Sequence, residues 1–383
     1  MTLLQAAVPY PSPIFSQRVM LGQHNVPSWD RYEAAMRDIF ERRYYTNQGP
    51  LARRFEERLQ DFLVVRHAVC VTNVTIGLMM AIEALGVHGR VLVPGVCNTA
   101  ALHALAWCGA EPAFCDVDPV SGHLSVAGAQ AAHDDQVKAL LGANLWGDAS
   151  AAPMLTAFAA ARGMPVLFDS AHSLGCEIAG RRVGTFGQIE VLGFGEGDIL
   201  NAAGAACVTT DDDELAARLR NIRSSYGAGR PVPVVKTSNG RMSEAQAALG
   251  LLSVDGFALN RKRNQTLFDA YLSQLRGIAG IRVVEPHGAA VSNHQSLVCA
   301  VDERVFGLSR DRLIDRLSAD NIEARAVDVA QDIDGLARPL PTTGHIAASW
   351  LMLPIGAHVD VAMVATVCEI IGRASLQADG ASV

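Results

Sequence analysis

Short apolar runs alternate with helical patterns along the first two thirds of the chain. Runs of four to six residues occur at positions 68–71, 90–93, 112–115 and 137–142, and helical segments follow the first, second and fourth of them. Strands buried on both faces of a parallel sheet read as short, nearly continuous apolar runs. Their alternation with helices is typical of an α/β protein. We therefore predict an α/β fold with a mostly parallel sheet covered on both faces.

Two further apolar runs are followed by acidic and histidine side chains that could bind a ligand or transfer protons. One run ends at Asp169 and is followed by His172, and the next, 189–194, breaks into Gly-Glu-Gly-Asp with Glu196 and Asp198. Ligands of open α/β sheets bind beyond the carboxyl ends of the strands. These four side chains are therefore candidate site residues. Each also has a purely structural alternative. Asp169 could be the N-cap of a helix, and Glu196 and Asp198 could be solvated turn residues. His172 could be a histidine packed in the core.

The character of the chain changes beyond about residue 258. Ser243 is expected to cap a helix through Leu252, and a separate helix is expected at 260–275. Strand-like runs and helical patterns then follow at 281–284, 296–301, 309–319 and 362–373. We expect a large domain over residues 1–255, including an N-terminal arm, and a smaller C-terminal α+β domain over residues 256–383.

Composition excludes several classes of partner. The net charge is −7 and the acidic and basic residues are scattered without a basic block, which argues against nucleic acid and anionic membranes. The eight cysteines form no CxxC pair, several lie in apolar runs, and this pattern is typical of a reducing cytoplasm. No signal peptide and no membrane-spanning run is expected. We predict a cytoplasmic location.

Lysine is scarce. The chain has lysines only at positions 138, 236 and 262, so 29 of its 32 lysine and arginine residues are arginines. Few amines are therefore available for Schiff-base chemistry. Asp116 and Asp118 could be read as a metal pair, but Asp-Val-Asp-Pro is expected as a turn at a strand exit, and we predict no metal site.

Six stretches in order carry a resemblance to a known family. They are Asn47-Gln-Gly-Pro50 with Phe55-Glu56, Thr72-Asn-Val-Thr75, Asp116-Val-Asp-Pro119, Asp169-Ser-Ala-His172, residues 180–187 and residues 239–244. The chain resembles the DegT/StrS sugar aminotransferases, which are pyridoxal phosphate (PLP) enzymes of the aspartate-aminotransferase type, fold type I. The resemblance covers nearly the whole chain. It implies that fold, a small-molecule substrate and a homodimer with shared active sites.

The resemblance also implies roles for individual residues. Asp169 matches the acid that bonds the pyridine nitrogen of the cofactor, the contact that makes the ring an electron sink. Thr75 matches a phosphate contact, and His172 matches a residue packed by the ring. Asn239 matches a residue lent to the phosphate by the partner subunit. Asn98 falls at the position of the aromatic residue that stacks on the ring.

The chain departs from the family pattern where the cofactor is normally held. The family segment Ser-Phe-His-x-Thr-Lys-x-Leu-Asn corresponds to residues 193–201, which places Asp198 at the Schiff-base lysine, Gly193 at the phosphate-binding serine and Gly195 at the histidine. A carboxylate cannot form a Schiff base. Glu196 and Asp198 would also repel a nearby phosphate. PLP or its amine form PMP is thus a candidate cofactor, but these departures from the family pattern argue against its binding.

Three functional hypotheses follow from these residues. The first is an enzyme of specialised or sugar metabolism in which Asp198, Glu196 and Asp169 perform lysine-independent acid–base chemistry on a small polar substrate. The second keeps PLP or PMP noncovalently for a sugar dehydratase or transaminase half-reaction. The third is an inactive paralogue that stabilises or regulates an active partner. Lys236 could supply an amine to the partner's site, but a surface role is favoured.

Overall fold

A seven-stranded sheet forms the centre of the larger part of the molecule. The computed structural model describes residues 12–224, 230–233, 236–287, 289–330 and 339–380. The strand order is β1 (His67–Val71), β9 (Ala205–Thr210), β8 (Ile189–Phe194), β5 (Val166–Asp169), β4 (Val137–Ala143), β2 (Gly89–Pro94) and β3 (Ala110–Cys115). The pairs β2–β3, β2–β4, β4–β5 and β5–β8 are parallel, whereas β9 is antiparallel to both neighbours. The mostly parallel sheet expected from the apolar runs is confirmed.

Helices cover both faces of this sheet. One buried cluster packs the sheet against α2 (Pro50–Leu63), α5 (Val126–Ala132), α6 (Ala152–Ala160) and the first part of α8 (Glu244–Leu275). A second cluster packs its other face against α3 (Val74–Leu85), α4 (Thr99–Trp107) and α7 (Asp213–Arg223). Strand residues alternate between the clusters, as Val191 and Leu192 of β8 do. Buried strands of this kind need apolar residues on both faces.

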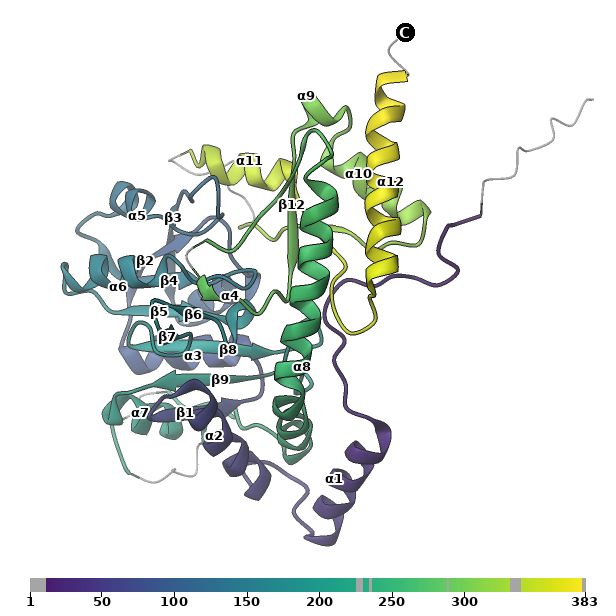
Figure 1. Cartoon of the computed structure of the whole chain (residues 1–383). Helices are drawn as coiled ribbons and strands as arrows, with labels where there is room; N and C mark the ends of the chain where they lie inside the picture. The colour runs from purple at the N-terminus through teal and green to yellow at the C-terminus, as the bar shows by residue number, and fades with distance from the viewer. Residues whose placement is uncertain (1–11, 225–229, 234–235, 288, 331–338, 381–383) are drawn as a thin grey trace, which may run out of the picture.

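A smaller sheet is built from the C-terminal part of the chain. Its order is β10 (Ile281–Val283), β12 (Leu297–Val301), β14 (Trp350–Leu353) and β13 (Arg325–Ala326). It packs against the C-terminal half of α8, α10 (Arg310–Ala319) and α12 (Val361–Gly380), with the short helices α9 (Glu303–Phe306) and α11 (Pro341–Ser349) beside it (Figure 1). A third, three-stranded sheet pairs β11 (Ala289–Val291), β6 (Glu177–Ile178) and β7 (Arg181–Arg182).

The prediction of two helices in residues 243–275 was wrong. α8 is one continuous helix of 32 residues that passes from the large sheet to the small one (Figure 1). Ser243 does cap it, together with Gln246, in a capping box. The expected domain boundary between residues 255 and 256 falls inside α8 and stays a prediction. Every helix within the described ranges is too short or too polar to cross a lipid bilayer.

Two of the family-like stretches lock together at the start of α2 and α8. The carboxylate of Glu244 accepts hydrogen bonds from the backbone N–H groups of Leu51 and Ala52, both at 3.0 Å. These are orphan donors in the first turn of α2. A Cβ atom on Gly49 would lie 2.6 Å from the Glu244 carboxyl carbon, so this approach requires glycine. Pro50 then takes the first helical position, where no N–H is needed.

A buried ion pair joins α2 to α7 and β1. The guanidinium of Arg223 donates to the carboxylate of Glu56 and, at 2.8 Å, to the carbonyl of Cys70. The same carboxylate accepts from the N–H of Cys70 at 2.9 Å. The two charged side chains are 3% and 12% exposed. Because β1 is an edge strand, this pair satisfies backbone groups that no neighbouring strand reaches.

The Glu56→Gln variant should be markedly less stable. It keeps an acceptor for Cys70 but leaves the Arg223 charge buried without a counter-ion, a change that typically costs about 3–5 kcal/mol. We expect a clearly lower thermal unfolding midpoint by circular dichroism. Glu57→Gln, on the exposed face of the same helix, should change stability by no more than about 0.5 kcal/mol. Equal midpoints for the two variants would contradict the role given to the pair.

Candidate active site

The site lies where β4, β5 and β8 end side by side. Ala143 and Asp169, the last residues of β4 and β5, are paired in register, and β8 ends next to them at Phe194. The loops that follow these strands bring residues 144–147, 170–175 and 195–201 to one edge of the sheet. This is the carboxyl edge at which ligands of α/β sheets bind.

A cavity of about 260 Å³ opens at this edge. It is lined by residues of the N-terminal arm, of the loops after β5 and β8, and of the small domain. They include Leu21, Gly22, His24, His172, Glu196, Gly197, Asp198, Gln295, Ser296, Glu323, Arg325, Met352, Leu353 and Ile355. Three of the four candidate residues, His172, Glu196 and Asp198, are therefore brought together around one cavity. Asp169 is buried beside it and does not line it.

Asp198 accepts hydrogen bonds from neutral N–H groups. Its Oδ2 accepts from the backbone N–H of Gly195 at 2.6 Å, and its Oδ1 accepts from the side-chain amide of Gln295 at 3.2 Å. Asp198 therefore closes its own turn and also lines the cavity, but it is partly buried rather than a solvated turn residue. Burial raises the pKa of its carboxyl group, while His172, Gly195 and Gln295 act in the opposite direction.

Asp169 and His172 form the rest of the titratable cluster. Asp169 precedes Ser170, the N-cap residue of the short 3-10 turn Ala171–Ser173, and its Oδ1 accepts from the N–H of Ala171 at 3.2 Å. Burial raises the pKa of the Asp169 carboxyl group, and the nearby charge of Asp198 also raises it. His172 and the N–H of Ala171 act in the opposite direction. The Nδ1 atom of His172 is buried and has no hydrogen-bond partner in the described part of the chain.

Glu196 stands apart from this cluster. Its side chain is 76% exposed and its Oε1 lies 3.0 Å from Nδ1 of His24, on the N-terminal arm. The backbone of the arm follows the same loop, since the His24 N–H donates to the Glu196 carbonyl at 3.1 Å. Glu196 thus holds the arm against the rim of the cavity and is the most solvated of the predicted acids.

The other predicted site residues lie on helix ends. Thr75 is in the first turn of α3, and Asn98 caps α4 through a 3.0 Å bond from the Ala100 N–H to its Oδ1. Asn239 is exposed just before α8 and accepts from Arg241 at 2.8 Å. None of the three lines the cavity formed by the described residues.

The three lysines of the chain all lie in described segments and away from this cavity. Lys138 donates to the carbonyl of Asp135 at 2.9 Å, and Lys236 pairs with Glu83 of α3 at 2.6 Å. Lys262 is on the exposed side of α8. Within this chain Lys236 is a surface charge, as favoured from the sequence. The described residues contain no cluster of His, Cys, Asp or Glu suited to a metal ion.

The aspartates that could be read as a metal pair have structural partners. Asp116 accepts from the N–H groups of Thr342 and Thr343 at 3.0 and 2.8 Å, and so caps α11 of the small domain. Asp118 accepts from the N–H groups of Val120 and Ser121 in its own turn. Asp116 is thus an anchor between the large sheet and the small domain.

Sequence reasoning missed several residues of the cavity. His24, Glu323 and Arg325 come from the arm and the small domain, far from the strand ends in sequence. Gln295 lies in the loop before β12 and reaches Asp198 through its amide. No local pattern marks these residues, because only the packing of α8 and the small domain brings them to the sheet edge.

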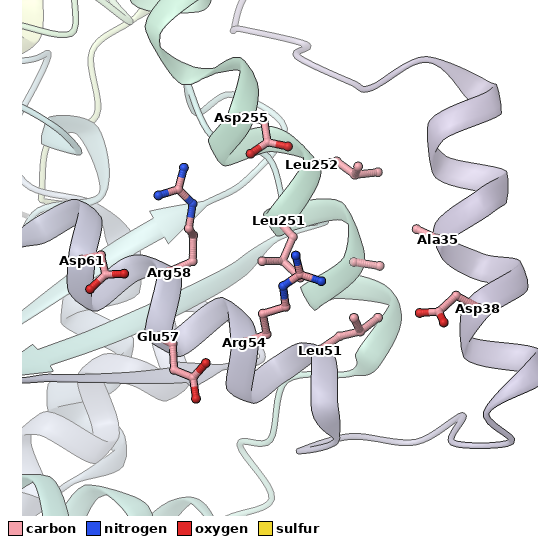
Figure 2. A pocket seen from close by; sticks show the side chains of 11 residues that line it. Ala35, Asp38, Leu51, Arg54, Glu57, Arg58, Asp61, Leu251, Leu252 and Asp255 are labelled. Carbon is pink, nitrogen blue, oxygen red and sulfur yellow. The ribbon is translucent and has the colours of Figure 1, made fainter.

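A larger depression of about 420 Å³ lies elsewhere, between α1 (Trp29–Glu41), α2 and α8 (Figure 2). Its floor is apolar, with Leu51 and Leu251, and Arg54 and Arg58 extend from α2 over it (Figure 2). Acidic residues of all three helices share its rim, and none of the predicted site residues is there. It is a solvated groove between helices and is separate from the carboxyl edge of the sheet.

The architecture and the position of this site define an aminotransferase-like α/β protein. A model of the DegT/DnrJ/EryC1/StrS aminotransferase family matches residues 30–372. The chain belongs to this family, as its sequence motifs indicate. Members of the family are PLP-dependent aminotransferases of sugar metabolism.

Several known proteins are similar over most of their length. The chain is 28% identical over 309 residues to a dTDP-4-amino-4,6-dideoxy-D-glucose transaminase of Shigella dysenteriae, covering 80% of this chain and 83% of that protein. It is 29% identical over 330 residues to a GDP-perosamine synthase of Caulobacter vibrioides, covering 83% of this chain and 85% of that protein. The crystal structure of DesI with its TDP-sugar product superimposes with a TM-score of 0.91 at 33% sequence identity, covering 97% of this chain and 96% of the DesI chain.

A buried relay supports the turn that carries Asp169 and His172. The amide of Asn144 donates to the Ser170 hydroxyl at 2.8 Å, and this hydroxyl donates to Glu190 of β8 at 3.2 Å. Glu190 is fully buried and also accepts from the N–H groups of Gly184 and Phe186. Burial raises the pKa of Glu190 to about 8, although these donors act in the opposite direction.

The raised pKa of Glu190 predicts a pH-dependent stability. The folded protein keeps the proton up to about pH 8, whereas the unfolded chain releases it near the ordinary value of 4.5. Stability should therefore fall as the pH rises through this window. Glu190→Gln, which cannot ionise, should show a flatter dependence of the thermal midpoint on pH. Glu111→Gln, exposed on β3, serves as the control, and an unchanged slope in Glu190→Gln would contradict the assignment.

Proposed function

We propose that this chain catalyses lysine-independent acid–base chemistry on a small polar, sugar-type substrate, with Asp198 as the principal proton-transferring group. The observation that carries the proposal is the placement of Asp198, which lines the cavity at the carboxyl edge beside His172 and close to buried Asp169. Neighbouring titratable groups with perturbed pKa values are typical of acid–base sites.

The three groups have distinct roles in this proposal. Asp198 faces the cavity, so it is the group that takes a proton from the substrate or returns one. His172 lines the same cavity, and its proximity favours the ionised form of Asp198. Asp169 is buried, and its charge and that of Asp198 disfavour each other, so the two carboxyl groups titrate as a coupled pair. Glu196 is a weaker candidate for catalysis because it is exposed and paired with His24.

Relatives and cavity size support the substrate class. The Shigella and Caulobacter relatives are named for nucleotide-linked amino sugars, and DesI was crystallised with a TDP-sugar. The cavity of about 260 Å³ is smaller than the 300–1,000 Å³ usual for drug-sized ligands. It suits a group the size of one sugar ring, with any larger part of the substrate outside it.

The residues around Asp198 do not fit covalently held PLP. The acid for the ring nitrogen, Asp169, is in place, but the lysines within this chain are elsewhere and a carboxylate stands in the loop after β8. The Oδ2 atom of Asp198 lies 3.1 Å from where a Cβ atom on Gly193 would be, and Val74 of the α3 N-terminus lies 3.0 Å from the same point. Asp198 thus occupies space beside the helix end where a phosphate would need to bind. The proposed chemistry involves no cofactor.

Noncovalent binding of PLP or PMP is the second candidate. Buried Asp169 at the end of β5 and Thr75 in the N-terminal turn of α3 favour it, since these would hold the ring nitrogen and the phosphate if Asp198 moved aside. Such a group would supply an electron sink for a sugar dehydratase or transaminase half-reaction. An inactive paralogue remains the third alternative.

We also propose that the chain forms a homodimer in which Asn239 contributes to the partner's site. Asn239 lies exposed beside the start of α8, and Lys236 is three residues before it. The proposal follows the subunit arrangement implied by the family resemblance.

Replacing the proton-transferring group should abolish activity. For Asp198→Asn we expect turnover to fall by about 100- to 10,000-fold, the usual contribution of a general acid or base. The assay is NMR in D₂O with nucleotide-linked and free amino and keto sugars, which detects both product and solvent deuterium in the substrate. Asp61→Asn, an exposed change on α2, should retain full turnover. If Asp198→Asn remains active, the proposed function is wrong.

Reduction chemistry tests the cofactor part of the proposal. After brief incubation with one equivalent of PLP, borohydride and gel filtration, we expect only slow, partial labelling of exposed amines, because no lysine lines the cavity formed by the described residues. A chromophore retained without a mass increase would favour the second candidate. A rapid, stoichiometric PLP adduct that disappears in Lys236→Ala, while the slow labelling of Lys138 and Lys262 persists, would instead show that a lysine reaches the site across a dimer, and would contradict lysine independence.

A further inference from the structure

Five buried amide side chains form a connected network behind the cavity. Gln23 and Asn25 come from the N-terminal arm, Asn264 from α8, and Asn293 and Gln295 from the loop before β12. Their exposed fractions range from 0 to 6%. Gln23 donates to the Gln295 carbonyl at 2.7 Å and accepts from Asn264 at 2.9 Å. Asn25 donates to the carbonyl of Ile199, in the loop of Asp198, at 3.1 Å.

The network fixes which way the Gln295 amide faces. Its Oε1 accepts from the backbone N–H of Ile199 at 3.2 Å and from the Asn293 amide at 3.3 Å. A backbone N–H can only donate, so the oxygen of Gln295 must face Ile199. The NH₂ group therefore faces Asp198, 3.2 Å from its Oδ1. If the Gln295 amide were flipped, its NH₂ group would face the N–H of Ile199 and its oxygen would face the carboxylate of Asp198.

Asn293 holds this arrangement from the other side. It is fully buried, its Oδ1 accepts from the N–H of Gln295 at 3.0 Å, and its amide donates to the carbonyls of His172 and Leu174 at 3.2 and 3.1 Å. One loop of the small domain thus binds both the turn of His172 and the carboxylate of Asp198. Of the five amides only Asn264 has a buried atom, its Oδ1, without a hydrogen-bond partner in the described part of the chain. The bonds around Asn293 and Gln295 favour a single local arrangement.

We propose that Gln295 is a positioning residue that orients the carboxylate of Asp198 toward the cavity and favours its ionised form. The proposal rests on the function proposed for Asp198. With the Gly195 N–H on Oδ2 and the Gln295 amide on Oδ1, both oxygens have a donor that cannot accept a proton. Such donors stabilise the carboxylate relative to the carboxylic acid.

Other charged groups near Asp198 do not substitute for this contact. Asp169 and His172 lie on the β5 side, Glu196 is in the same loop, and His24, Glu323 and Arg325 line the cavity opposite. Glu196 and Glu323 have partners in His24 and Arg18. Within the described ranges, none of these six side chains has a hydrogen bond to the Asp198 carboxylate.

The isosteric variant Gln295→Glu gives the sharpest test. It keeps an oxygen for Ile199 and Asn293 but turns a carboxylate toward Asp198, so the pKa of Asp198 should rise by about 1–2 units. The measurement is a ¹³C NMR titration of protein labelled at the aspartate carboxyl carbon, with the Asp198 signal assigned by its loss in Asp198→Asn. The acidic limb of the kcat–pH profile should move by the same amount.

Two further variants keep the test decisive. Gln295→Met retains the length without the N–H donor and should raise the Asp198 pKa by less than Gln295→Glu does. Gln130→Glu makes the same charge change on the exposed face of α5 and should not shift it. Circular dichroism confirms that each variant folds. If the pKa of Asp198 in both Gln295 variants equals the pKa of Asp198 in the Gln130→Glu variant, the proposal is overturned. Because this titration needs no substrate, it gives an answer even if Asp198→Asn remains active and the proposed function fails.

Discussion

The position of α8 determines how the two sheets meet at the site. The carboxylate of Glu244 fixes the first turn of this helix to α2, and Ser243 and Gln246 close its N-terminus. The helix then runs unbroken to Leu275 and carries Asn264 into the amide network behind the cavity. Because α8 packs on the large sheet at one end and the small sheet at the other, the loop of Gln295 is held over the loop of Asp198.

The fold could be predicted largely from the apolar runs, since strands buried on both faces have few alternatives. The break predicted within residues 243–275 failed for a physical reason. Ala247 and Ala248 pack in the core of the large sheet, whereas Leu267 and Phe268 pack in the core of the small domain. The change in composition near residue 258 therefore marks a change of neighbours along one helix. β9 was missed because its alanines and threonines, although fully buried, form no strongly apolar run.

The site could be predicted only as far as the strand ends. Asp198, Glu196 and His172 follow β5 and β8 directly, so the parallel sheet alone brings them to one edge. Gln295 and His24 could not be found in this way, because they arrive from the small domain and the arm. The resemblance added Thr75, Asn98 and Asn239, and of these Asn98 has a sufficient structural role as the cap of α4. A role in binding stays a prediction for all three.

The departures from the family pattern around Asp198 fit one another. A Cβ atom on Gly193 would lie 2.9 Å from the Ala171 Cβ and 3.1 Å from Oδ2 of Asp198, and one on Gly195 would lie 3.2 Å from the same oxygen. The two glycines therefore leave the room that the carboxylate occupies when it folds back onto the Gly195 N–H. The surroundings of residue 198 thus supply hydrogen-bond donors to an acceptor, the Asp198 carboxylate.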